Sequence, residues 1–292
     1  MQMFFKFFER FIYFFFDVQY DWEIGFVKQN ISDYIFSTKK SKVKWLKMPR
    51  NVFWADPFIL YRNSQYYVFY EELNKNQGYG TINCMVFDST IKMLSNDIVI
   101  DEGVHFSFPY LIEDGKDIYM LPETSLKNEL ALYKAIDFPL IWEKQSVLLN
   151  LPAMDSIVFR EGGYWYLLYS DANRDDGSLF YRKSKDLVIS WELIEEVLIS
   201  KSFHNTRSAG NVIKYKDQLY RPTQKCDNYY GEAVVLNIID FGNNKLNEEE
   251  VKLIHYNNRF VKGFHTISSC KNITFVDRRR YRLFFNNFRK IF

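Results

Sequence analysis

The pattern of apolar and polar residues repeats along most of the chain. Each copy starts at a polar or small residue, continues as an apolar run, breaks at a turn and ends in a second apolar run that contains tyrosine. Short apolar runs bounded by turns predict strands, and a repeat of about fifty residues built from such strands is typical of a β-propeller. Four clear copies and a fifth, looser copy lie at 54–72, 106–124, 153–171, 207–225 and 263–279.

The copies carry polar residues at two matching positions, which we call the first and second columns. Equivalent ends of all blades meet at the axis of a propeller, so both columns are expected to line one funnel. The first column holds Asp56, Phe108, Asp155 and Ala209, with His265 in the looser copy. The second column, fifteen residues later, holds Glu71, Glu123, Ser170 and Gln224, and a tyrosine precedes it in every clear copy, as Tyr67, Tyr119, Tyr166 and Tyr220.

We therefore predict an all-β fold, a five-bladed β-propeller, with blades near residues 50–98, 104–150, 151–200, 205–255 and 260–285. A further strand, predicted at 20–29, would pair with the last blade and close the ring, which removes an exposed edge. No linker rich in proline or glycine divides the chain. The predicted organisation is therefore a Phe-rich terminal segment, 1–19, followed by one propeller, 20–292.

The terminal segments combine phenylalanine with charge. In the first, Lys6, Glu9 and Arg10 fall on one face of a helix, as in an amphipathic helix that lies in a membrane interface. Its uninterrupted apolar run is too short for a membrane span or a signal peptide. Residues 278–292 mix basic and aromatic residues in a similar way. Both ends are expected to contact a membrane surface, and packing on the propeller or on a partner chain is the alternative.

Composition narrows the class of protein. Aromatic residues make up 19% of the chain, which suits strands, and a formal net charge of +2 makes nucleic acid an unexpected partner. Three cysteines fit neither a disulfide framework nor a metal-binding spacing, and such a sparse set favours a reducing compartment. We expect a cytoplasmic protein that can reach the inner face of the membrane. We expect no metal, since no close spacing of His, Cys and Asp exists, and no cofactor, since the sequence holds no phosphate-binding or dinucleotide-binding glycine motif.

The columns and their neighbours supply the candidate site residues. Clustered carboxylates push their pKa values apart, so that one site supplies both an acid and a base, as glycosidic chemistry requires. Structural alternatives stay open: an aspartate can start a turn, a glutamate can end a solvated strand, and a histidine can be a hydrogen-bonded core residue. The catalytic candidates are Asp56, Asp155 and Glu232. The substrate-binding candidates are Glu71, Glu72, His105, Glu123, Asp171, His204, Arg207, Gln224, Tyr230, His265 and Arg278.

A set of short motifs resembles a known family. These are Ala-Asp-Pro-Phe at 55–58, Tyr-Glu-Glu at 70–72, Phe-Ser-Phe-Pro-Tyr at 106–110, Pro-Glu-Thr at 122–124 and Asp-Ser-Ile-Val-Phe at 155–159. Over roughly residues 50–280 the chain resembles the five-bladed propeller at the N-terminus of plant glucosamine inositolphosphorylceramide transferases, a domain also found in bacterial proteins tied to surface glycans. It is more distantly similar to propeller glycoside hydrolases of the arabinanase and β-xylosidase type. The latter likeness implies a base at Asp56 and an orienting group at Asp155, with Glu232 as the nearest match to their acid.

The resemblance and the candidate residues predict a carbohydrate-active protein. Our first hypothesis is a glycosyltransferase of bacterial surface polysaccharide or glycolipid synthesis, with Asp56 as base and Arg207 or His204 on the phosphate of a nucleotide sugar or lipid-linked substrate. The second is a glycoside hydrolase that uses Asp56, Asp155 and Glu232. The third is a propeller that binds glycans without catalysis, because one fold hosts many functions.

Overall fold

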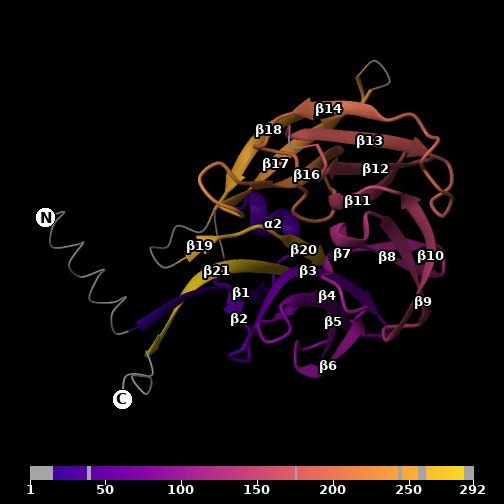
Figure 1. Ribbon diagram of the computed structural model, residues 1–292. Coiled ribbons are helices and arrows are strands. Elements are labelled where there is room, and N and C mark those ends of the chain that lie inside the picture. Colours follow the sequence, from indigo (N-terminus) through magenta and orange to yellow (C-terminus); the bar gives the residue numbers. More distant parts are fainter. Residues whose placement is uncertain (1–15, 38–40, 175, 243–244, 256–260, 286–292) are drawn as a thin grey trace, which may run out of the picture.

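The computed structural model describes residues 16–37, 41–174, 176–242, 245–255 and 261–285. Five antiparallel sheets surround one axis, so the predicted five-bladed β-propeller is confirmed (Figure 1). The predicted membrane-contacting segments span 1–19 and 278–292, and their parts at 1–15 and 286–292 lie outside the described residues. No described helix has the length and apolar character of a membrane span.

The first four blades each contain four strands in chain order. Blade one comprises β3 (Val52–Arg62), β4 (Gln65–Asn74), β5 (Tyr79–Asp88) and β6 (Met93–Ile100). Blade two comprises β7 (Ser107–Asp114), β8 (Asp117–Glu123), β9 (Leu130–Asp137) and β10 (Ile141–Leu149), with a short 3-10 helix at Ser125–Lys127. Blade three comprises β11 (Ala153–Glu161), β12 (Tyr164–Asp171), β13 (Ser178–Ser184) and β14 (Val197–Lys201). Blade four comprises β15 (Ile213–Tyr215), β16 (Gln218–Lys225), β17 (Ala233–Asp240) and β18 (Asn247–Ile254).

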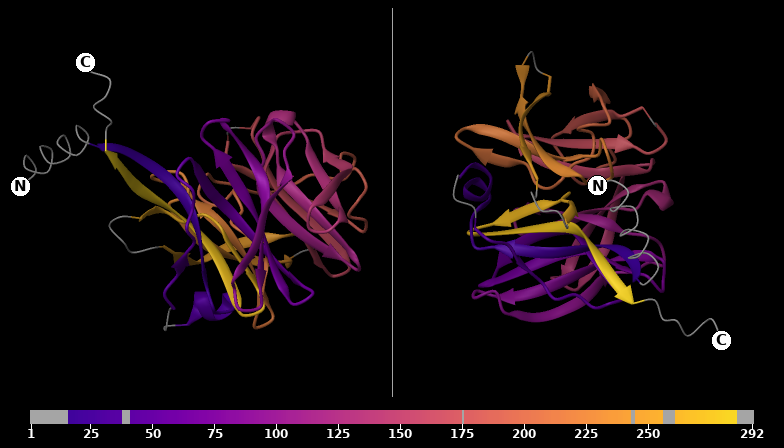
Figure 2. Two further views of the ribbon diagram at one scale, coloured as in Figure 1. Left: turned by 90° about the horizontal axis from the view of Figure 1, so that it is seen from below. Right: turned by 90° about the vertical axis from the view of Figure 1, so that its left-hand side faces the viewer.

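Blade five is built from both ends of the described chain. β21 (Ile273–Phe285) pairs antiparallel with β1 (Phe16–Val27) along the whole length of β1, so the predicted closure by an N-terminal strand is confirmed. The strand starts at Phe16, earlier than predicted. Figure 2 shows β1 and β21 running beyond the ring as a two-stranded ribbon. The same five-stranded sheet contains β2 (Lys44–Trp45), β19 (Val261–Gly263) and β20 (Ile267–Cys270), and α2 (Ile31–Phe36) contacts β20 and β21.

The first column owes its position to a bulge that three blades share. In blades one, two and three, the pairing of the first strand with the second shifts by one residue, at Asp56, Phe108 and Asp155 respectively. At these bulges the three residues have φ angles of 53°, 45° and 41°, in the left-handed region. A bulge re-aims the side chain it carries, and left-handed backbone outside glycine costs about 1–3 kcal/mol. Aspartate tolerates this conformation better than most residues do, which suits Asp56 and Asp155.

Blade four departs from this pattern through a glycine. Gly210 has a φ of 144°, and a Cβ at this position would lie 2.0 Å from the Ile267 carbonyl oxygen. Only glycine permits that approach. The backbone of Ile267 can therefore donate to the Ala209 carbonyl at 2.8 Å, which joins blade four to blade five next to the axis.

The core is aromatic and lies between the blades. Phe58 meets Phe108 at 4.9 Å and Tyr110 at 5.5 Å between ring centroids, both edge to face. Such pairs add about 0.5–1.5 kcal/mol beyond the area that they bury. The recurrent tyrosines Tyr67, Tyr119 and Tyr166 are also buried. That part of the repeat therefore builds the core rather than the site.

Candidate functional site

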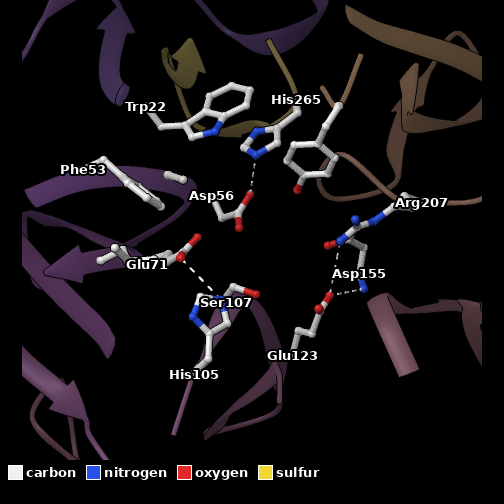
Figure 3. A pocket seen from close by; sticks show the side chains of 13 residues that line it. Trp22, Phe53, Asp56, Glu71, His105, Ser107, Glu123, Asp155, Arg207 and His265 are labelled. Atoms are coloured by element: carbon white, nitrogen blue, oxygen red, sulfur yellow. Dashed lines mark hydrogen bonds and ion pairs between the residues drawn. The ribbon is translucent and has the colours of Figure 1, made fainter. Parts of the chain in front are cut away.

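One pocket opens on the axis and receives side chains from all five blades (Figure 3). Its volume is about 210 Å³. Four carboxyl groups line it, those of Asp56, Glu71, Glu123 and Asp155. The other polar or aromatic residues in its wall are Trp22, Phe53, His105, Ser107, Arg207, Tyr230 and His265. Both columns of the repeat therefore contribute to one pocket that is rich in acids, although Phe108, Ala209, Ser170 and Gln224 are not among its lining residues.

Asp56 belongs to a buried network of hydrogen bonds and ion pairs. Asp277, which is 0% exposed, lies with its Oδ2 2.6 Å from His265 Nδ1. The opposite ring nitrogen, Nε2, lies 3.7 Å from Asp56 Oδ1, and the Thr266 hydroxyl donates to the same Asp56 oxygen at 2.7 Å. Trp22 stacks on the His265 ring, with centroids 3.7 Å apart and planes 7° apart. The ring is thus fixed in place, and its Nε2 faces Asp56.

Burial and neighbouring charge shift both groups. Burial raises the pKa of Asp56, His265 lowers it, and Asp155 and Asp277 raise it, so the net pKa lies above the usual 3.8. For His265, burial lowers the pKa but Asp277 and Asp56 raise it by more, so its pKa lies above 6.5. A carboxylate with a raised pKa is a stronger base, which suits Asp56 to proton abstraction.

Asp56, His265 and Asp277 offer ligand atoms within 4.8 Å of one another, which is close enough for a metal ion. However, Asp277 Oδ1 already accepts from the backbone amides of His265 and Thr266, both at 3.0 Å. Its Oδ2 faces His265 Nδ1 and accepts from the Asp56 amide at 3.2 Å. A cation there would meet these N–H donors, so the three residues fit a hydrogen-bonded network better than a metal site.

On the opposite side of the pocket, Asp155 is paired with Arg207. Arg207 Nε donates to Asp155 Oδ2, and Gln224 Nε2 donates to the same oxygen at 2.8 Å. Glu123 Oε2 accepts from the Asp155 amide at 2.8 Å and lies 3.6 Å from Arg207. Burial raises the pKa of Asp155, Arg207 lowers it and Glu123 raises it, with a net value of about 6. Gln224 lies behind the pocket wall, as a brace for Asp155.

Glu71 and His105 form a third unit of the wall. Glu71 is 6% exposed, and its Oε1 lies 3.5 Å from His105 Nε2. Burial, followed by the charges of Asp56 and Glu123, holds the pKa of Glu71 well above 4.5. Burial lowers the pKa of His105, and Asp56 raises it by less, so the ring favours its neutral form.

The structure does not bring Glu232 to the pocket, which corrects the prediction that it supplies the acid. Its carboxylate accepts from the side chain of Asn228 at 2.9 and 3.0 Å. His204 is also elsewhere, between Asp227 at 2.6 Å and Glu250 at 3.1 Å. Because Arg207 is held by Asp155, neither predicted phosphate contact is free to bind a phosphate.

Three further candidates serve local structure instead. Glu72 accepts from the Trp54 indole at 2.7 Å. Asp171 accepts from the Asn173 amide at 2.9 Å and so fixes a turn. Arg278 donates to Glu23 and lies over the ring of Trp45.

The residues that sequence reasoning missed are Trp22, Phe53, Ser107 and Thr266. Asp277 is a polar neighbour of the columns and follows an apolar run just as Glu71 and Glu123 do, although it is not among the predicted site residues. The pattern contained no signal for Trp22, because it reaches the axis only through the register of β1 on β21.

Replacing Arg207 with methionine is expected to raise the pKa of Asp155 above its value of about 6, because the guanidinium is the main group that lowers it. The pKa is measured by NMR titration of aspartate labelled with ¹³C at the carboxyl carbon. Arg174→Met is the control, since Arg174 lies 3.5 Å from Asp171 instead and should leave the Asp155 midpoint unchanged. A midpoint that falls in Arg207→Met would contradict the pairing.

A model of one protein family, glucosamine inositolphosphorylceramide transferase 1, N-terminal, matches residues 35–271. Curated proteins named glucosamine inositolphosphorylceramide transferase 1 are similar in sequence. The one from Oryza sativa subsp. japonica is 32% identical over 214 residues, which cover 70% of this chain and 28% of the relative. The one from Arabidopsis thaliana is 31% identical over 201 residues, which cover 66% of this chain and 26% of the relative. The chain thus spans little more than a quarter of these relatives, all of which are plant proteins and give no support to a bacterial setting.

Solved structures of glycoside hydrolases share the fold at low identity. An α-L-arabinofuranosidase from Podospora anserina aligns with a TM-score of 0.56 at 11% identity, over 77% of this chain and 90% of that one. A thermostable family-43 glycoside hydrolase aligns with a TM-score of 0.55 at 13% identity, over 80% and 90%. At such identity the likeness concerns the fold alone.

Proposed function

The chain belongs to the family of the N-terminal domain of glucosamine inositolphosphorylceramide transferase 1, which makes it a carbohydrate-active protein, and we propose that it catalyses glycosyl transfer to a hydroxyl acceptor in the axial pocket. Asp56 is the general base of this proposal. The observation that carries it is the buried Asp56 carboxyl, whose pKa is raised and which faces both the pocket and the fixed ring of His265.

Asp56 has the surroundings that a base needs. It takes a proton from the acceptor hydroxyl as that oxygen attacks the anomeric carbon, so its carboxylate becomes neutral. The nearby His265, held by Asp277, stabilises the carboxylate before the transfer. The left-handed backbone at Asp56 fixes the direction of the side chain, so little ordering remains to be done when a substrate binds.

The charge of the pocket favours a sugar that carries hydroxyl or ammonium groups. Four carboxyl groups line it, whereas Arg207 is the only lysine or arginine among the described lining residues and is already paired. The name of the curated relatives specifies glucosamine. An ammonium group on the sugar would be attracted by Glu123, and the exposed ring of Tyr230 offers a face on which a sugar can stack.

A glycoside hydrolase is the second candidate. It is favoured by the absence of an unpaired lysine or arginine from the described lining of the pocket, because a nucleotide or lipid phosphate requires such a group. In a hydrolase, Asp56 would activate water in place of the acceptor hydroxyl.

The relatives' name also contains a lipid, inositolphosphorylceramide. A lipid-linked acceptor would bring the chain to a membrane surface. We therefore keep peripheral membrane contact through the Phe-rich terminal segments, and a cytoplasmic location, as parts of the proposal.

The proposal is tested with the purified chain and a panel of nucleotide sugars, lipid-linked sugar phosphates and simple glycosides, each with and without inositolphosphorylceramide as acceptor. A new glycosylated lipid, detected by mass spectrometry, is the expected result. If free sugar is released at the same rate without acceptor, the protein is a glycoside hydrolase and the transferase proposal is wrong. Saturable binding without any turnover would overturn catalysis and leave a module that binds glycans.

A further inference from the structure

The carboxyl group of Glu71 lies beside the ring of His105 in the wall of the pocket (Figure 3). The Gly80 amide donates to His105 Nδ1 at 2.9 Å. Because Nδ1 accepts this bond, the proton of the neutral ring is on Nε2, which lies 3.5 Å from Glu71 Oε1. A ligand that presses Glu71 toward the ring would shorten this contact, as often happens when a site closes on its substrate.

Gly80 is built into the same unit. A Cβ at residue 80 would lie 2.9 Å from Glu71 Oε1 and 3.0 Å from His105 Cε1. It would also lie 2.7 Å from the Phe106 carbonyl oxygen. Only glycine therefore leaves room for the carboxyl group beside the ring, while its amide sets the ring's tautomer.

The unit orients a proton. His105 Nε2–H lies 3.5 Å from Oε1 of Glu71, and when this contact tightens into a hydrogen bond a neutral Glu71 carries its own proton on Oε2. Glu71 pairs across the ladder with Ala55, directly before Asp56, which places the two carboxyl groups at the same end of blade one. The arrangement thus places an acid, Glu71, close to a base, Asp56. Cleavage of a glycosidic bond requires both groups.

We propose that Glu71 is the acid that protonates the leaving oxygen of a glycoside donor, and that His105 is a positioning residue for it. This inference rests on the proposed glycosyl transfer and adds the class of donor. The Glu71 proton moves to the glycosidic oxygen while the bond from that oxygen to the anomeric carbon breaks, and its electron pair stays on the oxygen, which leaves as an alcohol. The attacking hydroxyl gives its proton to Asp56. Glu71 ends as a carboxylate and Asp56 as an acid, and one proton returned to Glu71 and one lost from Asp56 reset the site.

The charge of the pocket supports the same class of donor. A phosphate is a stable anion and leaves without an acid, whereas an alkoxide must be protonated as it leaves. A phosphate would also meet the carboxylates of Glu123 and Asp155, with Arg207 already held by the latter. An acid at Glu71 therefore has a use only for a donor joined through a glycosidic oxygen.

The protonated state of Glu71 is tested first, by infrared difference spectroscopy of the wild type against Glu71→Gln at neutral pH. A carboxylic-acid band that is lost in Glu71→Gln is expected. In His105→Phe the band should move to higher frequency, because the carbonyl loses the polar N–H that lies 3.5 Å from it. A carboxylate band for Glu71 in the resting protein would overturn the proposal, whatever reaction the protein catalyses.

The acid role is then tested with methyl glucosaminide and 4-nitrophenyl glucosaminide as donors. Glu71→Gln should lower kcat for the methyl glycoside by about 10²–10⁴-fold and for the nitrophenyl glycoside far less, because nitrophenolate leaves without an acid. His105→Phe should show the same dependence on the leaving group with KM unchanged, and His105→Gln, whose amide can replace Nε2–H, should recover most of the activity. If Glu71 or His105 had a merely structural role, its substitution would lower kcat equally for both donors.

Glu72→Gln is the matched control, since Glu72 is the adjacent glutamate and its carboxylate is held by the Trp54 indole outside the pocket. It should match the wild type with both donors. An equal loss of kcat for the two donors in Glu71→Gln would overturn the acid role of Glu71, while the proposed function would stand. If the wild type turns over neither donor, the proposed transfer from a glycoside fails and the inference falls with it, even where the acid band is present.

Discussion

Asp56→Asn should lower turnover by about 10²–10⁴-fold, because the amide cannot accept the proton of the attacking hydroxyl. Asparagine is the sharpest replacement at this position. It tolerates the left-handed backbone, with a φ of 53°, and it keeps an oxygen that can accept from the Phe108 amide or the Thr266 hydroxyl. Sugar affinity should change little, so that kcat falls while KM stays nearly constant.

The pH profile checks the same assignment. Asp56 acts as a base only when ionised, so turnover should rise with pH through the pKa of Asp56, which burial raises above 3.8. This acid limb should disappear from the residual activity of Asp56→Asn. Asp171→Asn is the control, since Asp171 is also a buried aspartate that accepts a backbone hydrogen bond, yet lies outside the pocket. Turnover within about tenfold of the wild type in Asp56→Asn would be too small a loss for a general base and would remove Asp56 from the mechanism.

The repeat made most of the fold and half of the site predictable. Asp56, Asp155, Glu71 and Glu123 occupy columns that recur, and equivalent positions of different blades must meet at the axis. The bulges that aim Asp56 and Asp155 were not predicted, although they explain why this position of the repeat carries function.

Several predicted site residues lie outside the pocket, for two physical reasons. Adjacent residues of a strand point to opposite faces, so Glu72 turns away from the pocket that receives Glu71. Glu232 and His204 lie outside the columns, in segments whose course depends on contacts with Asn228, Asp227 and Glu250 rather than on the repeat. Trp22 needed the register of β1 on β21, a pairing between the two ends of the chain that local pattern cannot supply.

Arg221→Met is expected to lower the free energy of unfolding by about 3–5 kcal/mol, because it leaves a buried carboxylate without its partner. Arg221 is 0% exposed, and two of its nitrogens donate to the two oxygens of Glu248 at 2.5 and 2.7 Å. The same guanidinium donates to the Asn205 carbonyl at 2.7 Å and to the Ser208 hydroxyl at 3.2 Å. These two residues flank Arg207, so the substitution should also loosen the arginine that holds Asp155.

The loss of stability is measured by urea unfolding, and two variants show that its source is the broken pair. Arg160→Met removes an arginine whose side chain is 57% exposed and lies 4.0 Å from Asp114, so its effect should stay within about 0.5 kcal/mol. The double variant Arg221→Met with Glu248→Leu removes both charges and should regain part of the lost stability, since replacing a buried pair costs less than breaking it. A double variant less stable than Arg221→Met would mean that Arg221 acts mainly through the Asn205 and Ser208 segment. The pair with Glu248 would then be secondary to the anchoring of the loop that delivers Arg207 to the site.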